Sequence, residues 1–312
     1  MEKKYRLITR SDFDGFVCCL LLKKLDLIDD ILFVHPRDMQ QKKVKIKERD
    51  ISANLPYAPG IYMAFDHHES EKKRIGQKYK NFVCNAKKPS AARIIFEYFK
   101  IAERFPGMFE EVLNALDKAD TAQFTKEEIL NPTGWALFNF ILDPKTSFER
   151  FHDFSMSHDD LCLLLIDKWN GQSIDEMLKL PELQERILLY HTYQEHFIEQ
   201  IKRSALVHKN VVIVDLSNEE VLYPGNRFMV YALYPQCDLS LFIQKENNDK
   251  KVTFSMGRSI LKRTSPVNVG KLLLKYNGGG HAGAGTCQAK ISDMDKVKAE
   301  LMGDIFTIYE GA

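Results

Sequence analysis

The first third of the chain alternates short apolar runs with longer amphipathic stretches. Apolar runs at residues 5–9, 31–34 and 61–65 have the length and composition of buried strands. Residues 15–25 and 90–105 instead repeat apolar side chains at helical spacing. Strands that alternate with helices indicate a mainly parallel sheet covered by helices. We therefore expect a doubly wound α/β domain.

The rest of the chain changes from helical to strand-like patterns. Residues 107–205 are mostly helical, and residues 181–204 form the longest stretch. Strand patterns occur at 211–214, 228–233, 239–243, 252–255 and 286–291. The chain ends with a helix over 267–276, a glycine-rich turn, the strand at 286–291 and a terminal helix. We expect two domains: residues 1–205, catalytic and metal-binding with a helical connector, and residues 206–312, a smaller mixed α+β substrate domain.

Composition and charge narrow the functional classes. The 312 residues carry a formal net charge of +1, which argues against holding long nucleic acid by neutralising many phosphates. Six cysteines show no paired CxxC spacing and are expected as reduced core residues. No apolar stretch approaches the roughly 20 residues that span a bilayer, and the start lacks the apolar core of a signal peptide. We expect a cytoplasmic protein with no membrane partner.

An acid and two imidazoles, Asp66, His67 and His68, directly follow the apolar run at 61–65. These side chains suit divalent metal chemistry at the point where a buried strand meets solvent. Two adjacent histidines are equally compatible with a solvated loop. The triplet alone does not decide between these interpretations.

Further acids follow other expected elements. Asp12 and Asp14 come after the run at 5–9, at a strand's carboxyl end, where α/β proteins bind ligands. The alternative is a turn in which Asp14 caps the next helix. Asp50 and Asp120 lie at similar junctions, and each alone is an ordinary loop or cap residue. Together these groups offer oxygen and nitrogen ligands for manganese or magnesium, and two such ions about 4 Å apart form a clamp for phosphoryl hydrolysis.

These motifs resemble the DHH phosphoesterase superfamily, in the branch with a DHH-associated C-terminal domain. Asp12-Phe13-Asp14-Gly15 is similar to the first motif, Asp50 to the isolated aspartate of the second, and Asp66-His67-His68 to the third. Asp120-Thr121-Ala122-Gln123-Phe124 resembles the fourth motif, although Asp117 competes for that role. The resemblance implies catalytic roles for Asp66, His67, His68 and Arg10, and it implies as metal ligands Asp12, Asp14, Asp50, His67 and Asp120.

The resemblance continues in the second domain, where a run of glycines is similar to the glycine-rich substrate loop of the associated domain. Arg258 is the expected phosphate clamp because its guanidinium is a planar fork of donors. A left-handed helix cap at Asn277 or Gly278 also explains part of the run, and both interpretations can hold. The expected substrate-binding residues are Arg258, Ser259, Asn268, Gly278, Gly279, Gly280 and His281.

One position departs from the family pattern. The first motif of active relatives usually opens with a metal-binding histidine, but Arg10 stands two residues before Asp12. Arginine stays protonated and does not ligate metals. Either one metal is bound weakly, or water replaces the ligand, or Arg10 contacts the substrate phosphate. We expect retained activity with Mn²⁺ or Mg²⁺, two ions in number, one of them weakly held.

The resemblance thus implies a divalent-metal-dependent phosphohydrolase that cleaves short phosphodiesters by metal-activated water, with oligoribonucleotides, very short RNA, linear dinucleotides or related small nucleotides as substrates. The chain looks most like the bacterial exopolyphosphatase-related and oligoribonuclease-like members, and a homodimer is common among relatives. Two alternatives remain. One is an exopolyphosphatase acting on inorganic polyphosphate, and the other is a catalytically impaired nucleotide sensor with Arg10 as its lesion.

Overall fold

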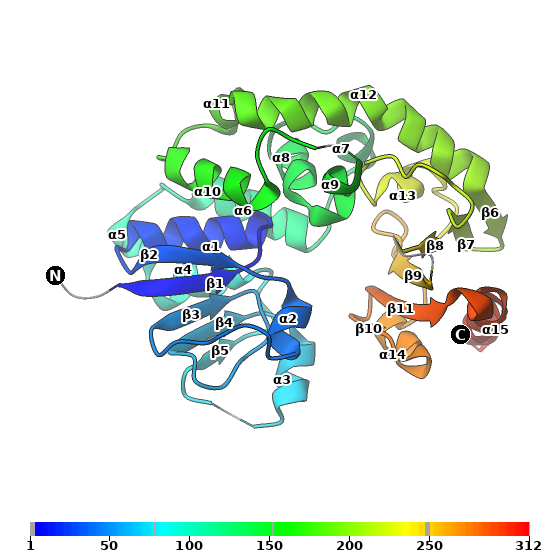
Figure 1. Cartoon of the computed structure of the whole chain (residues 1–312), viewed down its shortest axis with the longest axis horizontal. Helices are drawn as coiled ribbons and strands as arrows, with labels where there is room; N and C mark the ends of the chain where they lie inside the picture. The colour runs from blue at the N-terminus through cyan, green and yellow to red at the C-terminus, as the bar shows by residue number, and fades with distance from the viewer. Residues whose placement is uncertain (1–3, 78, 152, 247–249, 312) are drawn as a thin grey trace. The chain divides into compact units, whose positions relative to one another are not determined.

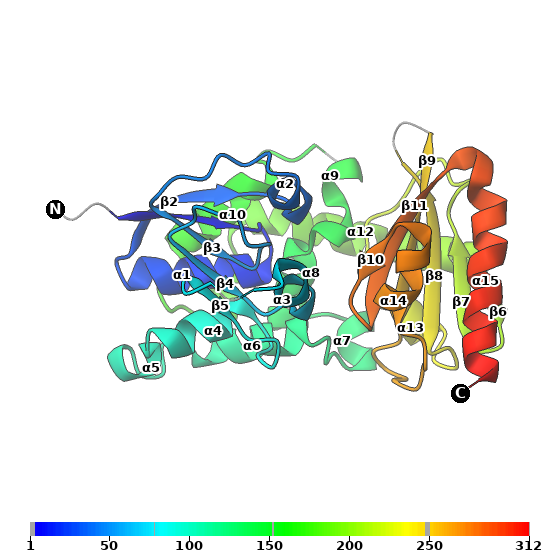
Figure 2. The same ribbon diagram turned by 90° about the horizontal axis from the view of Figure 1, so that it is seen from below.

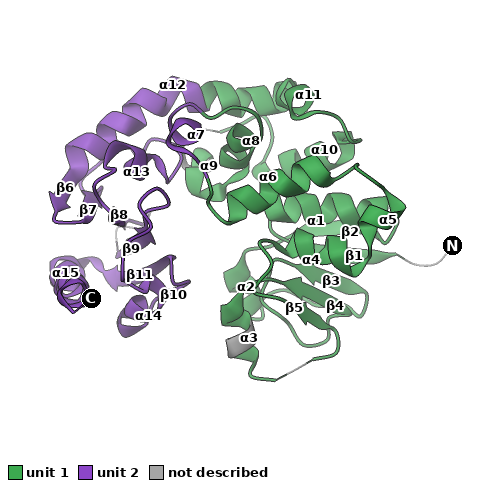
Figure 3. Cartoon of the chain, turned by 180° about the vertical axis from the view of Figure 1, so that it is seen from behind, with its two compact units in different colours: residues 1–123, 132–189 green, residues 124–131, 190–312 purple. Residues whose placement is uncertain are grey.

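The computed structural model describes residues 4–77, 79–151, 153–246 and 250–311. The chain forms two compact units, shown in Figure 3: residues 1–123 with 132–189, and residues 124–131 with 190–312. The division falls within the long helix α12 (Pro181–Ser204). The domain boundary expected at residue 205 stays a prediction; that residue follows α12 and begins the next strand.

The first unit is built on a five-stranded, fully parallel sheet with the order β2-β1-β3-β4-β5, visible in Figure 1. The second strand pairs with one edge of β1, and the third strand pairs with the opposite edge of β1. The sheet order therefore reverses between β1 and β3, which makes their carboxyl ends the expected ligand site. The strands are β1 (Tyr5–Thr9), β2 (Ile28–Phe33), β3 (Asp50–Ala53), β4 (Met63–Asp66) and β5 (Phe82–Cys84).

Helices complete the layers of this unit. Helix α1 (Phe13–Lys24) packs against α4 (Ala91–Tyr98), α6 (Glu110–Asp120) and α10 (His158–Lys168). Residues 13–22 of α1 are all buried, because the helix is enclosed between its neighbours and the sheet. A cluster of Ile8, Met39 and Leu55 packs α2 (Pro36–Gln40) and the loop after β3 onto β1, and Figure 2 gives a second view of these layers. The expected doubly wound α/β fold is confirmed.

Several short helices fill the remainder of the first unit. The helix expected over 90–105 is interrupted: α4 ends at Tyr98, and Lys100 adopts a left-handed conformation with φ 50° before α5 begins. No helix among the described residues is long and apolar enough to cross a membrane. The other helices here are α3 (Glu69–Ile75), α5 (Ile101–Arg104), α8 (Gly134–Leu142), η1 (Pro144–Thr146), α9 (Phe148–Phe151) and α11 (Ile174–Leu178).

The second unit holds a six-stranded mixed sheet with the order β10-β11-β9-β8-β7-β6. Only β7 and β8 pair in parallel, and the other neighbours are antiparallel. This arrangement confirms the mixed α+β class expected for the second domain. The strands are β6 (Ala205–His208), β7 (Val211–Asp215), β8 (Leu239–Lys245), β9 (Lys251–Arg258), β10 (Gly279–Gly280) and β11 (Ala284–Lys290).

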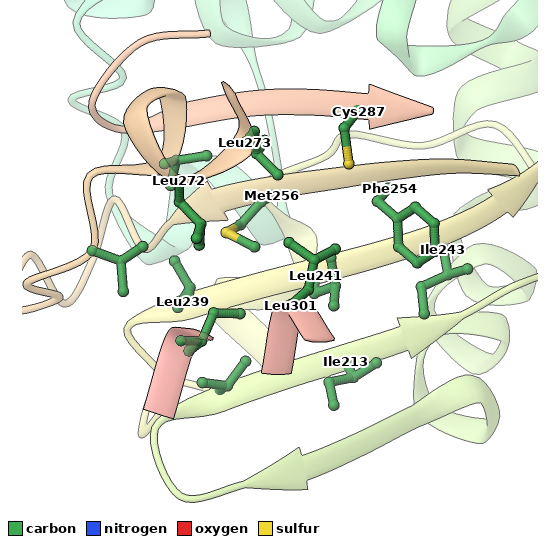
Figure 4. Packing of buried hydrophobic residues seen from close by; sticks show 14 of the residues in the cluster. Ile213, Leu239, Leu241, Ile243, Phe254, Met256, Leu272, Leu273, Cys287 and Leu301 are labelled. Atoms are coloured by element: carbon green, nitrogen blue, oxygen red, sulfur yellow. The ribbon is translucent and has the colours of Figure 1, made fainter. Parts of the chain in front are cut away.

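Helices cover this sheet through one apolar core. Along β9, Val252, Phe254 and Met256 are buried at every second position, as expected for a strand with one face on a core. Figure 4 shows Phe254 and Met256 in the cluster that also holds Leu272 and Leu301. Those leucines belong to α14 (Val269–Leu273) and α15 (Met294–Glu310); the remaining helices are α7 (Lys126–Leu130), α13 (Met229–Leu233), η2 (Leu274–Tyr276) and η3 (Ile291–Asp293).

The strand expected at residues 228–233 is wrong, because this segment forms α13. Met229, Val230, Tyr231 and Ala232 are all buried, and the helix packs against α7. A short continuous apolar run has no periodicity that distinguishes a buried strand from a buried helix. Tertiary packing decides the conformation here.

Candidate active site

Three neighbouring strands of the first unit deliver polar residues to one edge of the sheet. Strand β1 leads into Arg10, β3 leads into Asn54, and β4 ends at Asp66. Because these strands are parallel and adjacent, their carboxyl ends meet at the same edge. The first turn of α1 begins there as well and carries Asp14.

A carboxylate, an imidazole and a second carboxylate come together at this edge. The nearest ligand atoms of Asp14, His67 and Asp120 all lie within 4.8 Å of one another. The Nε2 atom of His67 is 3.9 Å from Asp14 Oδ2 and 4.0 Å from Asp120 Oδ2. Three of the expected metal ligands, which come from α1, the end of β4 and the last residue of α6, thus form one group.

Asp14 is held in place by the amino end of α4. Its carboxylate accepts the backbone N–H groups of Ala91 (3.0 Å) and Ala92 (2.9 Å), where Ser90 caps the helix. Unpaired N–H groups and the helix dipole both favour a negative charge at this position. Burial raises the pKa of Asp14, and the neighbouring His67 and the two N–H donors oppose that shift. The side chain is 1% exposed, so a nearby cation would stabilise its charged form.

The two histidines have different surroundings. Burial lowers the pKa of His67, which favours the neutral ring that binds a metal. Burial acts in the same direction on His68, but the bond to Asp66 outweighs it and the pKa of His68 is raised. Asp66 Oδ1 lies 2.7 Å from His68 Nδ1 and also accepts the backbone N–H of His67 at 2.9 Å. Asp66 therefore orients the imidazole of His68 and fixes the backbone of His67.

Two buried oxygens at this edge have no hydrogen-bond partner among the described residues. They are Oδ2 of Asp66, which is fully buried, and Oδ1 of Asn54, which is 4% exposed. An unsatisfied buried oxygen costs about 1–3 kcal/mol, and a hard divalent cation is a natural partner for oxygen. Together with the group of Asp14, His67 and Asp120, these oxygens fit a divalent metal ion.

Arg10 and Asp12 form an ion pair beside this group. Arg10 Nε lies 3.0 Å from Asp12 Oδ2. Asp12 Oδ1 caps α1 by accepting the N–H of Gly15 at 3.0 Å, and it also accepts from Asn54 Nδ2 at 3.4 Å. Asp12, and not Asp14, is thus the cap residue. Gly15 is required, because a Cβ atom there would lie 1.8 Å from the carbonyl oxygen of Arg10.

The Arg10 guanidinium lies in a strongly acidic environment. Its pKa is raised mainly by the charge of Asp12, against the opposing effect of burial, with further contributions from Asp143, Asp120 and Asp14. The side chain is nevertheless 31% exposed. A positive group that is both anchored and accessible suits contact with a substrate anion.

The structure separates Asp50 from the other expected ligands. Asp50 is the first residue of β3, so it lies at the amino end of the parallel sheet, opposite the carboxyl edge. Arg6 donates to both of its oxygens, at 2.9 and 2.7 Å, and the N–H of Lys47 donates at 2.6 Å. The assignment of Asp50 as a metal ligand is therefore corrected to a structural ion pair.

Asn54 stands where Asp50 was expected, and sequence reasoning missed it. It follows β3 and has φ 57°, a left-handed conformation that asparagine tolerates. The sequence signal was an Asn directly after the buried residues 51–53, and an amide does not stand out among acidic metal ligands. Between the two candidates for the fourth motif, Asp120 joins the group, whereas Asp117 accepts from Arg93 and Ser90.

The second unit brings the expected substrate residues next to one another. The N–H of Arg258 donates to Gly283 at 2.7 Å, and the N–H of Val269, directly after Asn268, donates to Ala282 at 3.0 Å. A Cβ on Gly270 would lie 2.4 Å from the Gly280 carbonyl oxygen, so the glycine loop packs directly on the first turn of α14. The loop begins after Asn277, whose left-handed φ of 55° confirms the expected cap.

Two of these residues use their side chains locally. Ser259 Oγ accepts the N–H groups of Leu261 and Lys262, and Asn268 Oδ1 caps α14 by accepting the N–H of Lys271. Their side-chain oxygens therefore support the loops that surround Arg258 and the glycine run. Direct substrate contacts by Ser259 and Asn268 stay predictions, as do those of Arg258, Gly278, Gly279, Gly280 and His281.

Comparisons with solved structures identify the class of protein. The chain is 47% identical to the pGpG-specific phosphodiesterase PggH from Vibrio cholerae, with 97% of this chain and 99% of that chain covered and a TM-score of 0.83. An exopolyphosphatase-related protein from Bacteroides fragilis shares the fold at 12% identity, with 96% and 92% covered and a TM-score of 0.54. RecJ from Thermus thermophilus, solved with Mn²⁺, shares it at 14% identity, with 98% and 52% covered and a TM-score of 0.60.

The chain belongs to the DHH phosphoesterase superfamily, which confirms the resemblance seen in its motifs. Membership in this superfamily makes the chain a phosphohydrolase. No protein-family model matches the chain, and no curated protein matches it. PggH is a solved protein that it resembles at high identity.

Proposed function

We propose that this chain hydrolyses the linear guanine dinucleotide pGpG. The observation that carries the proposal is the 47% identity to a pGpG-specific phosphodiesterase over nearly the full length of both chains. The acidic edge of the first unit and the glycine loop of the second supply the residue types that a small phosphodiester requires. A cytoplasmic location and a homodimer also remain proposals.

We propose that Asp14, His67 and Asp120 hold the ion, with Mn²⁺ or Mg²⁺ as its identity. Carboxylate and imidazole donors suit both of these cations. When bound, the ion supplies Lewis-acid activation of water and of the phosphoryl oxygen. Asp66 fixes the backbone of His67 through its N–H and orients the ring of His68, so it supports the ligand residue.

The remaining chemistry belongs to the side chains of this chain. Arg10, fixed by Asp12, would donate to an oxygen of the scissile phosphate and stabilise its growing negative charge. His68, held by Asp66, would donate a proton or hydrogen bond from its ring to the same phosphate. In the second unit, Arg258 and the backbone N–H groups of the glycine loop would bind the distal phosphate.

The test is a substrate panel with purified protein and Mn²⁺. Release of GMP from pGpG is measured against other linear dinucleotides, RNA of three to five nucleotides, adenosine bisphosphate and inorganic polyphosphate. We expect pGpG to have the highest kcat/KM. A D120N variant serves as the control for contaminating phosphodiesterases, because it removes one proposed ligand while leaving Asp117 unchanged.

Each alternative has its own result in this panel. Preferred hydrolysis of polyphosphate would replace the proposal with an exopolyphosphatase. Tight binding of pGpG without hydrolysis of any member of the panel would indicate a nucleotide sensor. Equal kcat/KM values for pGpG and trinucleotides would overturn the dinucleotide assignment and favour a general oligoribonuclease.

A further inference from the structure

We propose that the active site holds one divalent ion, and that the guanidinium of Arg10 occupies the position of a second cation. The inference deepens the proposed function and rests on it, since it concerns the same phosphohydrolase site. It replaces the expectation of two ions that the family resemblance suggested. Three features of the site support it.

The first feature is that the residues suited to one ion form a single group. Within the described residues, the only set of three or more acid, histidine or cysteine side chains close enough to share an ion is Asp14, His67 and Asp120. The carboxylates of Asp14 and Asp120 both face His67 Nε2, at 3.9 and 4.0 Å. Together they carry two negative charges, which one divalent ion balances.

The second feature is that Asp12 already has its partners. Arg10 Nε pairs with one oxygen at 3.0 Å, and the other oxygen accepts from Gly15 and Asn54. A metal bound by Asp12 would have to displace Arg10 or lie next to it. Two cations in contact repel strongly in a site of low dielectric constant, so the ion pair opposes a second metal.

The third feature is that the bridging position carries no charge. Two adjacent metals need an acid between them, but the residue that follows β3 is Asn54, and the acid Asp50 is bound by Arg6 at the opposite end of the strand. Asn54 Nδ2 donates to Asp12, which leaves Oδ1 as a neutral oxygen without a donor. A neutral amide can complete the sphere of one ion, but it lacks the charge to hold two together.

A guanidinium suits the role that remains. It is permanently charged, and its planar donors match the oxygens of a phosphate. The backbone of Arg10 is fixed against the first turn of α1, because Gly15 approaches its carbonyl oxygen closely. The guanidinium of Arg10 is thus held near the proposed ion site, although it does not itself bind a metal.

The first experiment counts ions by native mass spectrometry and by equilibrium dialysis with elemental analysis, at saturating Mn²⁺. We expect one Mn²⁺ per chain in the wild type. The variant R10M should keep its single ion with equal or higher affinity, because a nearby positive charge is removed. Its kcat for pGpG should fall about 10²–10³-fold, as when one donor to a developing oxyanion is deleted. R104M is the matched control, since Arg104 is exposed on α5, outside the site.

The second experiment restores the family pattern. The double variant R10H/N54D introduces an imidazole and an acid and should bind two Mn²⁺ per chain. Two ions in the wild type would overturn the inference, as would a single ion in the double variant or full activity of R10M. These results are independent of substrate identity: one bound ion with preferred polyphosphate hydrolysis would leave the inference standing and remove only the proposed pGpG activity.

Discussion

Arg6 donates two hydrogen bonds to the carboxylate of Asp50, at 2.9 and 2.7 Å, at the amino end of the parallel sheet. The pair joins β1 to β3, and Asp50 is fully buried. Asp50 therefore stabilises the fold and has no expected part in metal binding.

Replacing Asp50 should separate these two roles. The variant D50N leaves the partly buried guanidinium of Arg6 without its charge partner, so the free energy of unfolding should fall by about 1–3 kcal/mol. Calorimetry measures the stability, and dialysis measures bound Mn²⁺ in the folded protein. Unchanged stability with loss of the ion would restore Asp50 as a ligand.

Asp120 and Asp117 provide a second matched pair, one turn apart on α6. D120N should lose the increase in Tm that saturating Mn²⁺ gives the wild type, because an ion that binds only the native state stabilises it. D117N should keep that increase and lower Tm without metal, since Arg93 loses its charged partner and the amide keeps only one of the two oxygens that Arg93 and Ser90 use. The reverse pattern in thermal unfolding would assign the fourth motif to Asp117.

The sequence predicted elements well where a pattern had one interpretation. Residues 5–9 and 181–204 match β1 and α12, because a strand of buried residues and a 24-residue amphipathic repeat are distinctive. It failed at α13, whose buried side chains have no periodicity. It also passed over β3, a four-residue strand that begins with an aspartate and contains a serine.

The site followed the same logic. The structure brings together Asp14, His67 and Asp120, three of the metal ligands that the family resemblance implied, and their binding of an ion stays a prediction. Asp50 was misplaced because sequence alone does not tell which end of a strand an acid occupies when the strand itself is unrecognised. Asn54 became visible only through its buried, unpartnered oxygen.

Arg258 is expected to act on binding more than on chemistry. R258A should raise KM for pGpG about 10–100-fold, the effect of losing a charge-assisted hydrogen bond worth about 1.5–3 kcal/mol. The ion count should stay unchanged, because Arg258 belongs to the second unit and the three proposed ligands to the first. Steady-state kinetics with R263M as the comparison would contradict the clamp if both variants kept the wild-type KM.

The pair of Lys298 and Asp215 gives a pH-dependent prediction. Lys298 Nζ donates to Asp215 at 2.7 Å and links α15 to β7. Burial raises the pKa of Asp215, but the bonds from Lys298 and Ser217 outweigh it and the pKa lies below the ordinary 3.8. The pair is partly exposed, so K298M should cost about 0.5–1 kcal/mol at pH 7.

That cost should depend on pH in one direction. Because the pKa is lowered in the folded protein, the stabilisation is fully present above pH 3.8 and is lost as the pH falls through the lower, folded value. Urea unfolding of wild type and K298M at pH 7, 5 and 3 measures the difference. A gap that widened toward pH 3 would contradict the assignment.

The close approach of Gly15 to the Arg10 carbonyl has a practical meaning for enzyme engineering. A combinatorial library aimed at new phosphodiester substrates can vary the side chain at position 10, whereas the left-handed φ of 57° at Asn54 restricts position 54 to residues such as Asn, Asp or Gly. Position 15 has to stay glycine in such a library, because even a methyl group there would clash with the Arg10 carbonyl oxygen and displace the backbone that leads into α1. The smallest residue in the motif thus sets the limit on how far its neighbours can be redesigned.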